Sequence, residues 1–171
     1  MTLQAIKQAS GEITMESIFE SIPDFAKDIK LNLQSVLTKE GAPGLTEQQR
    51  IGVALACAYS VKNQDMIRGL KNEFNPSSEL DEAAKSAAAI MAMNNVYYRF
   101  VHLTDDKDFS KMPARLRMNV IGRPPVPKTD FELMSLAISS INGCGMGMNA
   151  HIHEGRKGEI NNEGIQSLIR I

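Results

Sequence analysis

The chain has 171 residues, of which 43 % are hydrophobic and 23 % charged, and these values are typical of a folded globular domain. Its 19 Lys and Arg residues balance 20 Asp and Glu residues, so there is no basic surface field to attract nucleic acid. No apolar run reaches the ~18 residues of a membrane span, and the N-terminus lacks the apolar core of a secretory signal, so we expect a cytoplasmic protein with one helical domain over residues 1–171.

The first third of the chain has the apolar spacing of helices. We expect residues 1–14 to form a loose N-terminal extension. Apolar residues recur at helical spacing over residues 15–37, and Pro23 predicts a kink or a division into two helices. Thr46 and Gln49 have the spacing of a capping box, which predicts that the next helix begins there.

The central part of the chain continues this helical pattern. Residues 63–65 interrupt the apolar stripe, and a further helix is expected to end before Pro76. A long, alanine-rich helix is predicted over residues 78–103. Residues 113–118 are predicted to form a short helix, and residues 123–127, which contain three prolines, form the clearest linker.

No segment has the strict alternation of a strand, so the sequence predicts an all-α, mostly antiparallel helix bundle. Residues 81–90 and 162–171 share Glu, Ser and Ile at equivalent places, which indicates either an internal duplication or a chance similarity. The second segment reaches Ile171 with an apolar pattern and no cap. We therefore expect the sequence to stop inside a helix.

Glu132 stands three residues after Thr129, again with capping-box spacing, and capping alone would explain it. It precedes Cys144 by twelve residues, which is about 18 Å along one continuous helix. A joint role for Glu132 and Cys144 therefore requires a break in the chain near Asn142 and Gly143, or a group from another subunit.

Cys144 is the best candidate for a nucleophile. Asn142 and Gly143 form a turn signal, so a helix is expected to begin near Cys144, where free backbone N–H groups and the helix dipole favour a thiolate. The alternative is a small buried hydrophobic residue, which is also the interpretation of Cys57 in its alanine-rich segment. Two cysteines exclude a disulfide scaffold and an all-cysteine zinc site.

His151 follows position 147 by four residues, so a side chain at 147 would be its neighbour on a helix. Position 147 is Gly, which costs a helix about 1 kcal/mol relative to Ala. His151 and His153 could also be ordinary surface or core histidines. Their spacing points them to different faces, with no third ligand nearby, so we expect no metal, and no glycine motif predicts a bound cofactor.

Nearly the whole chain from about Met15 resembles the AhpD-type alkyl hydroperoxidases, relatives of the carboxymuconolactone decarboxylases. The resemblance is carried by residues 22–33, 89–99 and 116–119, and most specifically by 131–133 followed by 140–144. It implies an all-α fold and a homo-oligomer, commonly a trimer.

The family pattern is a Glu, then Cys-x-x-Cys, then a His four residues later. Glu132, Cys144 and His151 fall on these places, whereas Gly147 falls on the second cysteine. In the family that second cysteine attacks the peroxide, and Cys144 matches its partner. A further histidine of some members is matched here by Met146. The resemblance therefore implies an active parent in which one thiol has been replaced.

The resemblance also implies the chemistry. A Glu and a His help to form a thiolate, which attacks the O–O bond and gives a sulfenic acid and an alcohol. The second thiol condenses with it to a disulfide, which a lipoyl-bearing adaptor reduces, and the family also reduces a peroxiredoxin partner. Gly147 predicts severe loss of this activity in the present chain.

Two other functions remain open at this stage. A lactone decarboxylase, or another non-redox enzyme on the same scaffold, would use His151 and Glu132 as acid and base and would not need Cys144. A non-catalytic helical module would use Cys144 at most to capture a partner.

Overall fold

The computed structural model describes residues 12–171, so residues 1–11 of the expected N-terminal extension lie outside the described residues. Residues 12–171 contain helices and no strand, which confirms the all-α prediction. In chain order the elements are α2 (Met15–Ser21), the 3-10 helix η1 (Asp24–Ala26), α3 (Lys27–Val36), α4 (Glu47–Ser60), α5 (Gln64–Phe74), α6 (Ser78–Leu103), α7 (Asp108–Lys111), α8 (Asn119–Gly122), α9 (Lys128–Ile141), α10 (Gly145–Lys157) and α11 (Asn162–Arg170).

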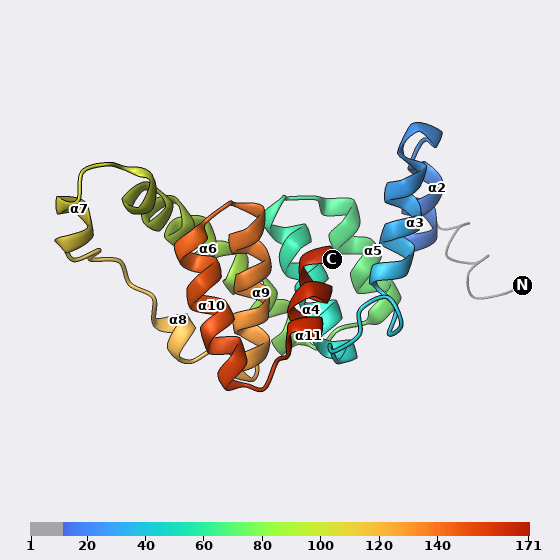
Figure 1. The fold of residues 1–171 in the computed structure, drawn as a ribbon. Helices are drawn as coiled ribbons and strands as arrows, with labels where there is room; N and C mark the ends of the chain where they lie inside the picture. The colour runs from blue at the N-terminus through green and yellow to red at the C-terminus, as the bar shows by residue number, and fades with distance from the viewer. Residues whose placement is uncertain (1–11) are drawn as a thin grey trace, which may run out of the picture.

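Helices α4, α6 and α9 pack against one another, and α10 packs on α9 and α6 (Figure 1). Helices α2 and α3 lie at one end of the molecule and α7 lies at the opposite end. No helix of residues 12–171 is both long enough and apolar enough to cross a bilayer. The main core lies where α4, α5, α6 and α9 meet, and its largest fully buried side chains are Leu55, Leu70, Met91, Phe131, Met134 and Ile138.

Pro23 divides the first apolar segment into two helices, as predicted. Thr14 caps α2 through its Oγ1, which accepts a hydrogen bond from the Ser17 N–H at 3.1 Å. The apolar stripe of this segment is less buried than its spacing suggests, because Phe25 is 94 % exposed. Val36 at the end of α3 is buried.

The predicted capping box at the start of α4 is confirmed. Thr46 Oγ1 accepts a hydrogen bond from the Gln49 N–H at 3.2 Å, and the Gln49 side chain accepts one from the Thr46 N–H at 3.0 Å. The predicted break is present but lies at residues 61–63, since α4 ends at Ser60 and Asn63 caps α5, which begins at Gln64. Asn75 ends that helix in the left-handed conformation, one residue before Pro76.

The predicted short helix over residues 113–118 is wrong. These residues are not helical, and the two short helices of this region, α7 and α8, lie on either side of them. Pro113 disfavours the helical conformation of the residue before it. Arg115 has a φ of 51°, which an α-helix does not accommodate.

Asp81 is the centre of a buried polar cluster between α4, α5 and α6. Its carboxylate accepts hydrogen bonds from the Tyr59 hydroxyl at 2.5 Å, from Lys71 at 2.8 Å and from Lys85 at 2.7 Å. Burial opposes ionisation, but the hydrogen bonds from Lys71, Lys85 and Tyr59 outweigh it and lower the pKa of Asp81 from 3.8 to about 2. The ionised carboxylate therefore stabilises the folded state.

Replacement of Asp81 by Asn is expected to lower the free energy of unfolding at pH 7 by roughly 1–3 kcal/mol, because a buried charged hydrogen-bond acceptor is lost. Since the folded-state pKa lies below 3.8, the stabilisation by Asp81 is complete above pH 3.8 and is lost as the pH falls toward about 2. Urea unfolding at pH 7 and between pH 2 and 4 measures both effects. Asp105→Asn, at an exposed position, is the control, and an equal loss in both variants would contradict the assignment.

Candidate functional site

Glu132 does not cap a helix, so the predicted capping box with Thr129 is wrong. Helix α9 begins at Lys128 after Pro127, with no side-chain cap. Because the proline linker is not helical and the helix begins directly after Pro127, Glu132 lies inside the helix rather than in its first turn. Its side chain is 3 % exposed and is available to groups in the interior.

The break that a joint role for Glu132 and Cys144 requires is present. Helix α9 ends at Ile141, and Gly143 has a φ of 63°, which glycine adopts without a steric penalty. Helix α10 then begins after Cys144 and folds back along α9. This reversal brings side chains from the two helices to the same place.

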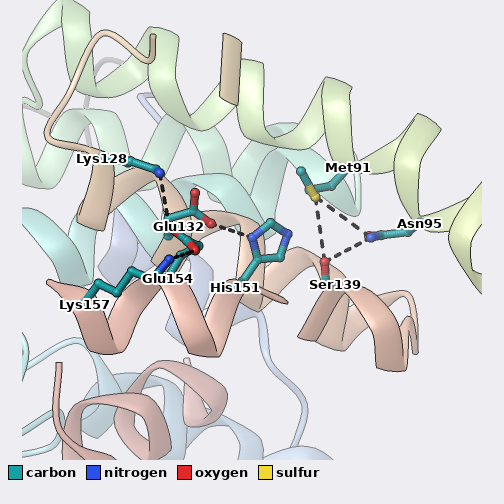
Figure 2. A network of polar contacts seen from close by, with 8 residues as sticks. All are labelled: Met91, Asn95, Lys128, Glu132, Ser139, His151, Glu154 and Lys157. Carbon is teal, nitrogen blue, oxygen red and sulfur yellow. Dashed lines mark hydrogen bonds and ion pairs between the residues drawn. The ribbon is translucent and has the colours of Figure 1, made fainter. Parts of the chain in front are cut away.

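The reversal places His151 beside Glu132. Their Nδ1 and Oε2 atoms are 2.7 Å apart, and the His151 side chain is only 10 % exposed. With Glu132 in its carboxylate form, which can only accept, this contact requires the hydrogen on Nδ1 and leaves Nε2 as the acceptor of the ring. Figure 2 shows the imidazole ring between Glu132 on one side and Met91 and Ser139 on the other.

Glu132, His151 and Gly147 line one cavity of about 470 Å³, a volume within the usual range of ligand sites. Most of its wall is apolar. The other lining residues are Met91, Asn94, Asn95, Tyr98, Met118, Ile121, Gly122, Met146, Ala150 and Glu154. An acid and an imidazole therefore meet in a space that can hold a small, mainly apolar molecule.

Glu154 and His153 take no part in the buried pair. Glu154 forms ion pairs with Lys157 and Lys128 (Figure 2). Hydrogen bonds from these two lysines lower the pKa of Glu154 to about 2, so it remains ionised at the edge of the cavity. His153 is exposed and does not line the cavity.

Cys144 is the N-cap residue of α10, which confirms that a helix begins there. Its Sγ accepts a hydrogen bond from the Gly147 N–H at 3.4 Å and so serves as the cap of the helix. The side chain is fully buried, as the core interpretation expects. It is not remote from the site, however, because its hydrogen-bond donor Gly147 lies in the cavity wall.

Gly147 lies where a longer side chain would contact Cys144. A Cβ atom built on Gly147 would be 3.3 Å from Cys144 Sγ, 3.1 Å from Asn95 Nδ2 and 2.9 Å from Ser139 Oγ. The side chain that is absent at this position would therefore point toward the one sulfur of the motif. The Ser139 hydroxyl would have to move to admit it, and Asn95 Nδ2 and Cys144 Sγ would have to shift by a few tenths of an ångström.

The comparisons with known proteins show which family the chain belongs to. Residues 107–171 match the Carboxymuconolactone decarboxylase family. The protein named alkyl hydroperoxide reductase AhpD of Brucella anthropi is 49 % identical over 92 % of this chain and 90 % of its own length. The AhpD of Coxiella burnetii is 47 % identical over the same shares. The chain belongs to the AhpD family.

This AhpD-type chain also contains polar residues that the sequence analysis did not single out. Asn95 donates a hydrogen bond to Ser139 Oγ at 3.0 Å and accepts one from Asn142 Nδ2 at 2.9 Å. Ser139 Oγ in turn lies 3.7 Å from Met91 Sδ (Figure 2). Isolated polar residues within apolar stretches of α6 and α9 were the signal that could have identified them.

Cys57 lies away from the family motif, beside a second, apolar cavity of about 530 Å³. Burial raises the pKa of the Cys57 thiol from 9.0 to about 12, so it is protonated at neutral pH. Cys57 is half-buried and packs against the core, which agrees with the prediction that it is a core residue.

Alkylation of Cys57 by iodoacetamide at pH 8 is therefore expected to be at least about tenfold slower than that of free cysteine. Mass spectrometry of a Cys144→Ala chain follows Cys57 alone. The same chain unfolded in urea is the control, and it should react at the rate of free cysteine. A folded chain that reacts as fast as the unfolded one would contradict the assignment.

Proposed function

We propose that this chain is an alkyl hydroperoxide reductase of the thiol-dependent type in which Gly147 interrupts the peroxidase cycle. The Glu132–His151 pair, 2.7 Å apart in a cavity that Gly147 also lines, is the observation that carries the proposal. The names of relatives that are 47–49 % identical support the same class of enzyme. The antioxidant role follows from the removal of organic peroxides.

The proposed reaction begins with a thiol at position 147. The His151–Glu132 pair accepts the thiol proton, and the thiolate attacks the O–O bond of the hydroperoxide. The O–O bond breaks, one oxygen stays on sulfur as a sulfenic acid, and the other leaves as an alcohol after it takes up a proton. The Cys144 thiol then forms a disulfide with that sulfur and releases water.

Gly147 removes the sulfur that the first step requires. Cys144 alone cannot complete the cycle, because a single thiol has no internal partner for a disulfide. Its full burial further restricts attack on a peroxide. The chain therefore retains the acid–base pair and one of the two thiols of the peroxidase, and we expect it to turn over little hydroperoxide.

The proposal includes partners that complete such a cycle. An external dithiol of the lipoyl type would reduce the disulfide, and a peroxiredoxin would exchange disulfides with it. No bound cofactor is needed. Two free thiols, Cys57 and Cys144, fit the reducing conditions of the cytoplasm.

We also propose that the chain forms a homotrimer. Apolar side chains are exposed along the second half of α6 and in the segment after it, at Val96, Phe100, Leu103 and Met112. Exposed apolar surface of this kind is typical of protein–protein interfaces. Analytical ultracentrifugation tests the proposal, and a monomer at micromolar concentration would contradict it.

The test of the function is steady-state consumption of an alkyl hydroperoxide with a dithiol reductant. It is carried out on this chain and on Gly147→Cys. Activity that appears only in the variant supports the proposal. Background activity in both chains would reject it.

A second candidate function is acid–base catalysis without a redox step, for example decarboxylation of a lactone. The intact Glu132–His151 pair favours it, since this pair needs no second cysteine to transfer a proton. The match of residues 107–171 to the Carboxymuconolactone decarboxylase family is consistent with it. Lactone turnover that survives Cys144→Ala would support this function over the peroxidase.

A further inference from the structure

Asn94 is a polar residue of the cavity that the proposed peroxidase chemistry does not use. It lies on α6, is only 5 % exposed and lines the cavity that contains Glu132 and His151. Its Oδ1 is buried and accepts no hydrogen bond from any described residue. A buried acceptor without a donor is unfavourable, so a molecule in the cavity whose donor group reaches this oxygen would be stabilised there.

The neighbouring amide, Asn95, differs from Asn94 because its hydrogen-bonding groups are paired within the protein. Asn95 is held on both sides, because it donates to Ser139 Oγ at 3.0 Å and accepts from Asn142 Nδ2 at 2.9 Å. Two consecutive amides on α6 thus differ in what they contact. Asn95 forms hydrogen bonds with other side chains of the protein. The Oδ1 of Asn94, a residue of the cavity wall, accepts none from the described residues.

The rest of the cavity wall determines what kind of molecule would fit. Met91, Met118, Ile121 and Met146 offer apolar and flexible contacts. The volume of about 470 Å³ admits a small organic molecule. An amide can also rotate about its terminal torsion and direct either its oxygen or its nitrogen toward such a molecule. A ligand with an apolar body and one hydroxyl-type group matches these features.

We propose that the Asn94 carboxamide accepts a hydrogen bond from the O–H group of a small apolar molecule, either an organic hydroperoxide or the alcohol derived from it. The class of this ligand rests on the proposed function, whereas binding itself needs no cysteine at position 147. Because Gly147 supplies no nucleophile, this chain holds the molecule without converting it. Asn94 is then a residue that selects for the O–H group.

Isothermal titration calorimetry with three matched probes tests the proposal. The probes are 2-phenyl-2-propanol, its methyl ether and cumene hydroperoxide, which share one apolar body, and only the ether has no O–H group. The alcohol and the hydroperoxide are expected to bind about tenfold more tightly than the ether, which corresponds to one net hydrogen bond. Tighter binding of the hydroperoxide than of the alcohol would assign the site to the substrate, and the reverse to the product.

Variants locate this preference at Asn94. Asn94→Leu, a side chain of similar size without an acceptor, is expected to bind the alcohol no more tightly than the ether. Asn32→Leu, at an exposed position on α3, should keep the tenfold preference. If circular dichroism shows that Asn94→Leu does not fold, Asn94→Ala replaces it with the same expected result.

Equal affinity of the unaltered chain for the alcohol and the ether would overturn the proposal, as would a preference that persists in a folded Asn94 variant. The alcohol and the ether are not peroxidase substrates, so this result is independent of any activity at position 147. Failure of the binding test would leave the Gly147→Cys assay unaffected. Likewise, a lack of hydroperoxide turnover by Gly147→Cys would not change the ratio of the affinities for the alcohol and the ether.

Discussion

Gly147→Cys is expected to raise hydroperoxide turnover with a dithiol reductant on the order of 1000-fold above that of the unaltered chain, because it supplies the missing nucleophile. The introduced Cβ would lie 3.3 Å from Cys144 Sγ, so the two sulfurs could bond. The cavity already contains the Glu132–His151 pair that would accept the thiol proton. The rate of hydroperoxide loss measures the effect.

Gly147→Cys also requires the side chains around position 147 to make room for the new Cβ atom. Ser139 Oγ lies 2.9 Å from the position of the new Cβ and must move, and Asn95 Nδ2, at 3.1 Å, must also shift slightly. Gly147→Ser has the same steric demand without a thiol and is the matched control. Equal turnover by the Ser and Cys variants would contradict the role of a sulfur at this position.

Glu132→Gln, introduced together with Gly147→Cys, is expected to lower hydroperoxide turnover by about 100-fold or more, the range of general acid–base catalysis. Gln preserves the size of Glu132 and can still accept a hydrogen bond from His151 Nδ1. It cannot stabilise the imidazolium that forms when His151 accepts the thiol proton. The pH dependence of kcat/KM, compared with the Gly147→Cys parent, separates this effect from a loss of folding.

Glu73→Gln is the matched control for that experiment, because Glu73 is an exposed carboxylate on α5 outside the cavity. It should leave both the turnover and its pH profile unchanged. An unchanged turnover in Glu132→Gln as well would mean that the buried pair does not assist the thiol. The acid–base role proposed for Glu132 and His151 would then be wrong.

Local signals in the sequence were sufficient to predict much of the fold. The capping box of Thr46 and Gln49 marks the start of α4 because both partners of its hydrogen bonds lie within one turn. The turn at Asn142 and Gly143 separates α9 from α10, since glycine permits the positive φ found there. Such features depend on neighbouring residues and can be predicted without knowledge of the tertiary structure.

The same local pattern failed at Glu132. Thr129 and Glu132 have capping-box spacing, yet the prolines of residues 123–127 determine where the helix begins. His151, nineteen residues later, is the actual partner of Glu132. The family resemblance placed both residues at the site, whereas their spacing alone did not.

The surroundings of the site depend on contacts between distant segments. Asn95 and Ser139 are 44 residues apart in the chain and meet only because α6 packs against α9. Whether Asn94 Oδ1 accepts a hydrogen bond also depends on the packed structure, because it is decided by which donor groups lie next to it. A sequence identifies such residues as polar, but not which of them are satisfied.

The central claim is that position 147 and Cys144 are placed to act as a pair beside the Glu132–His151 pair. Mass spectrometry of Gly147→Cys after one equivalent of an alkyl hydroperoxide tests it most directly. We expect a disulfide between Cys144 and the introduced cysteine, with loss of two hydrogen atoms and release of one equivalent of alcohol. Two free thiols, or oxygen retained on a single unpaired sulfur, would contradict it.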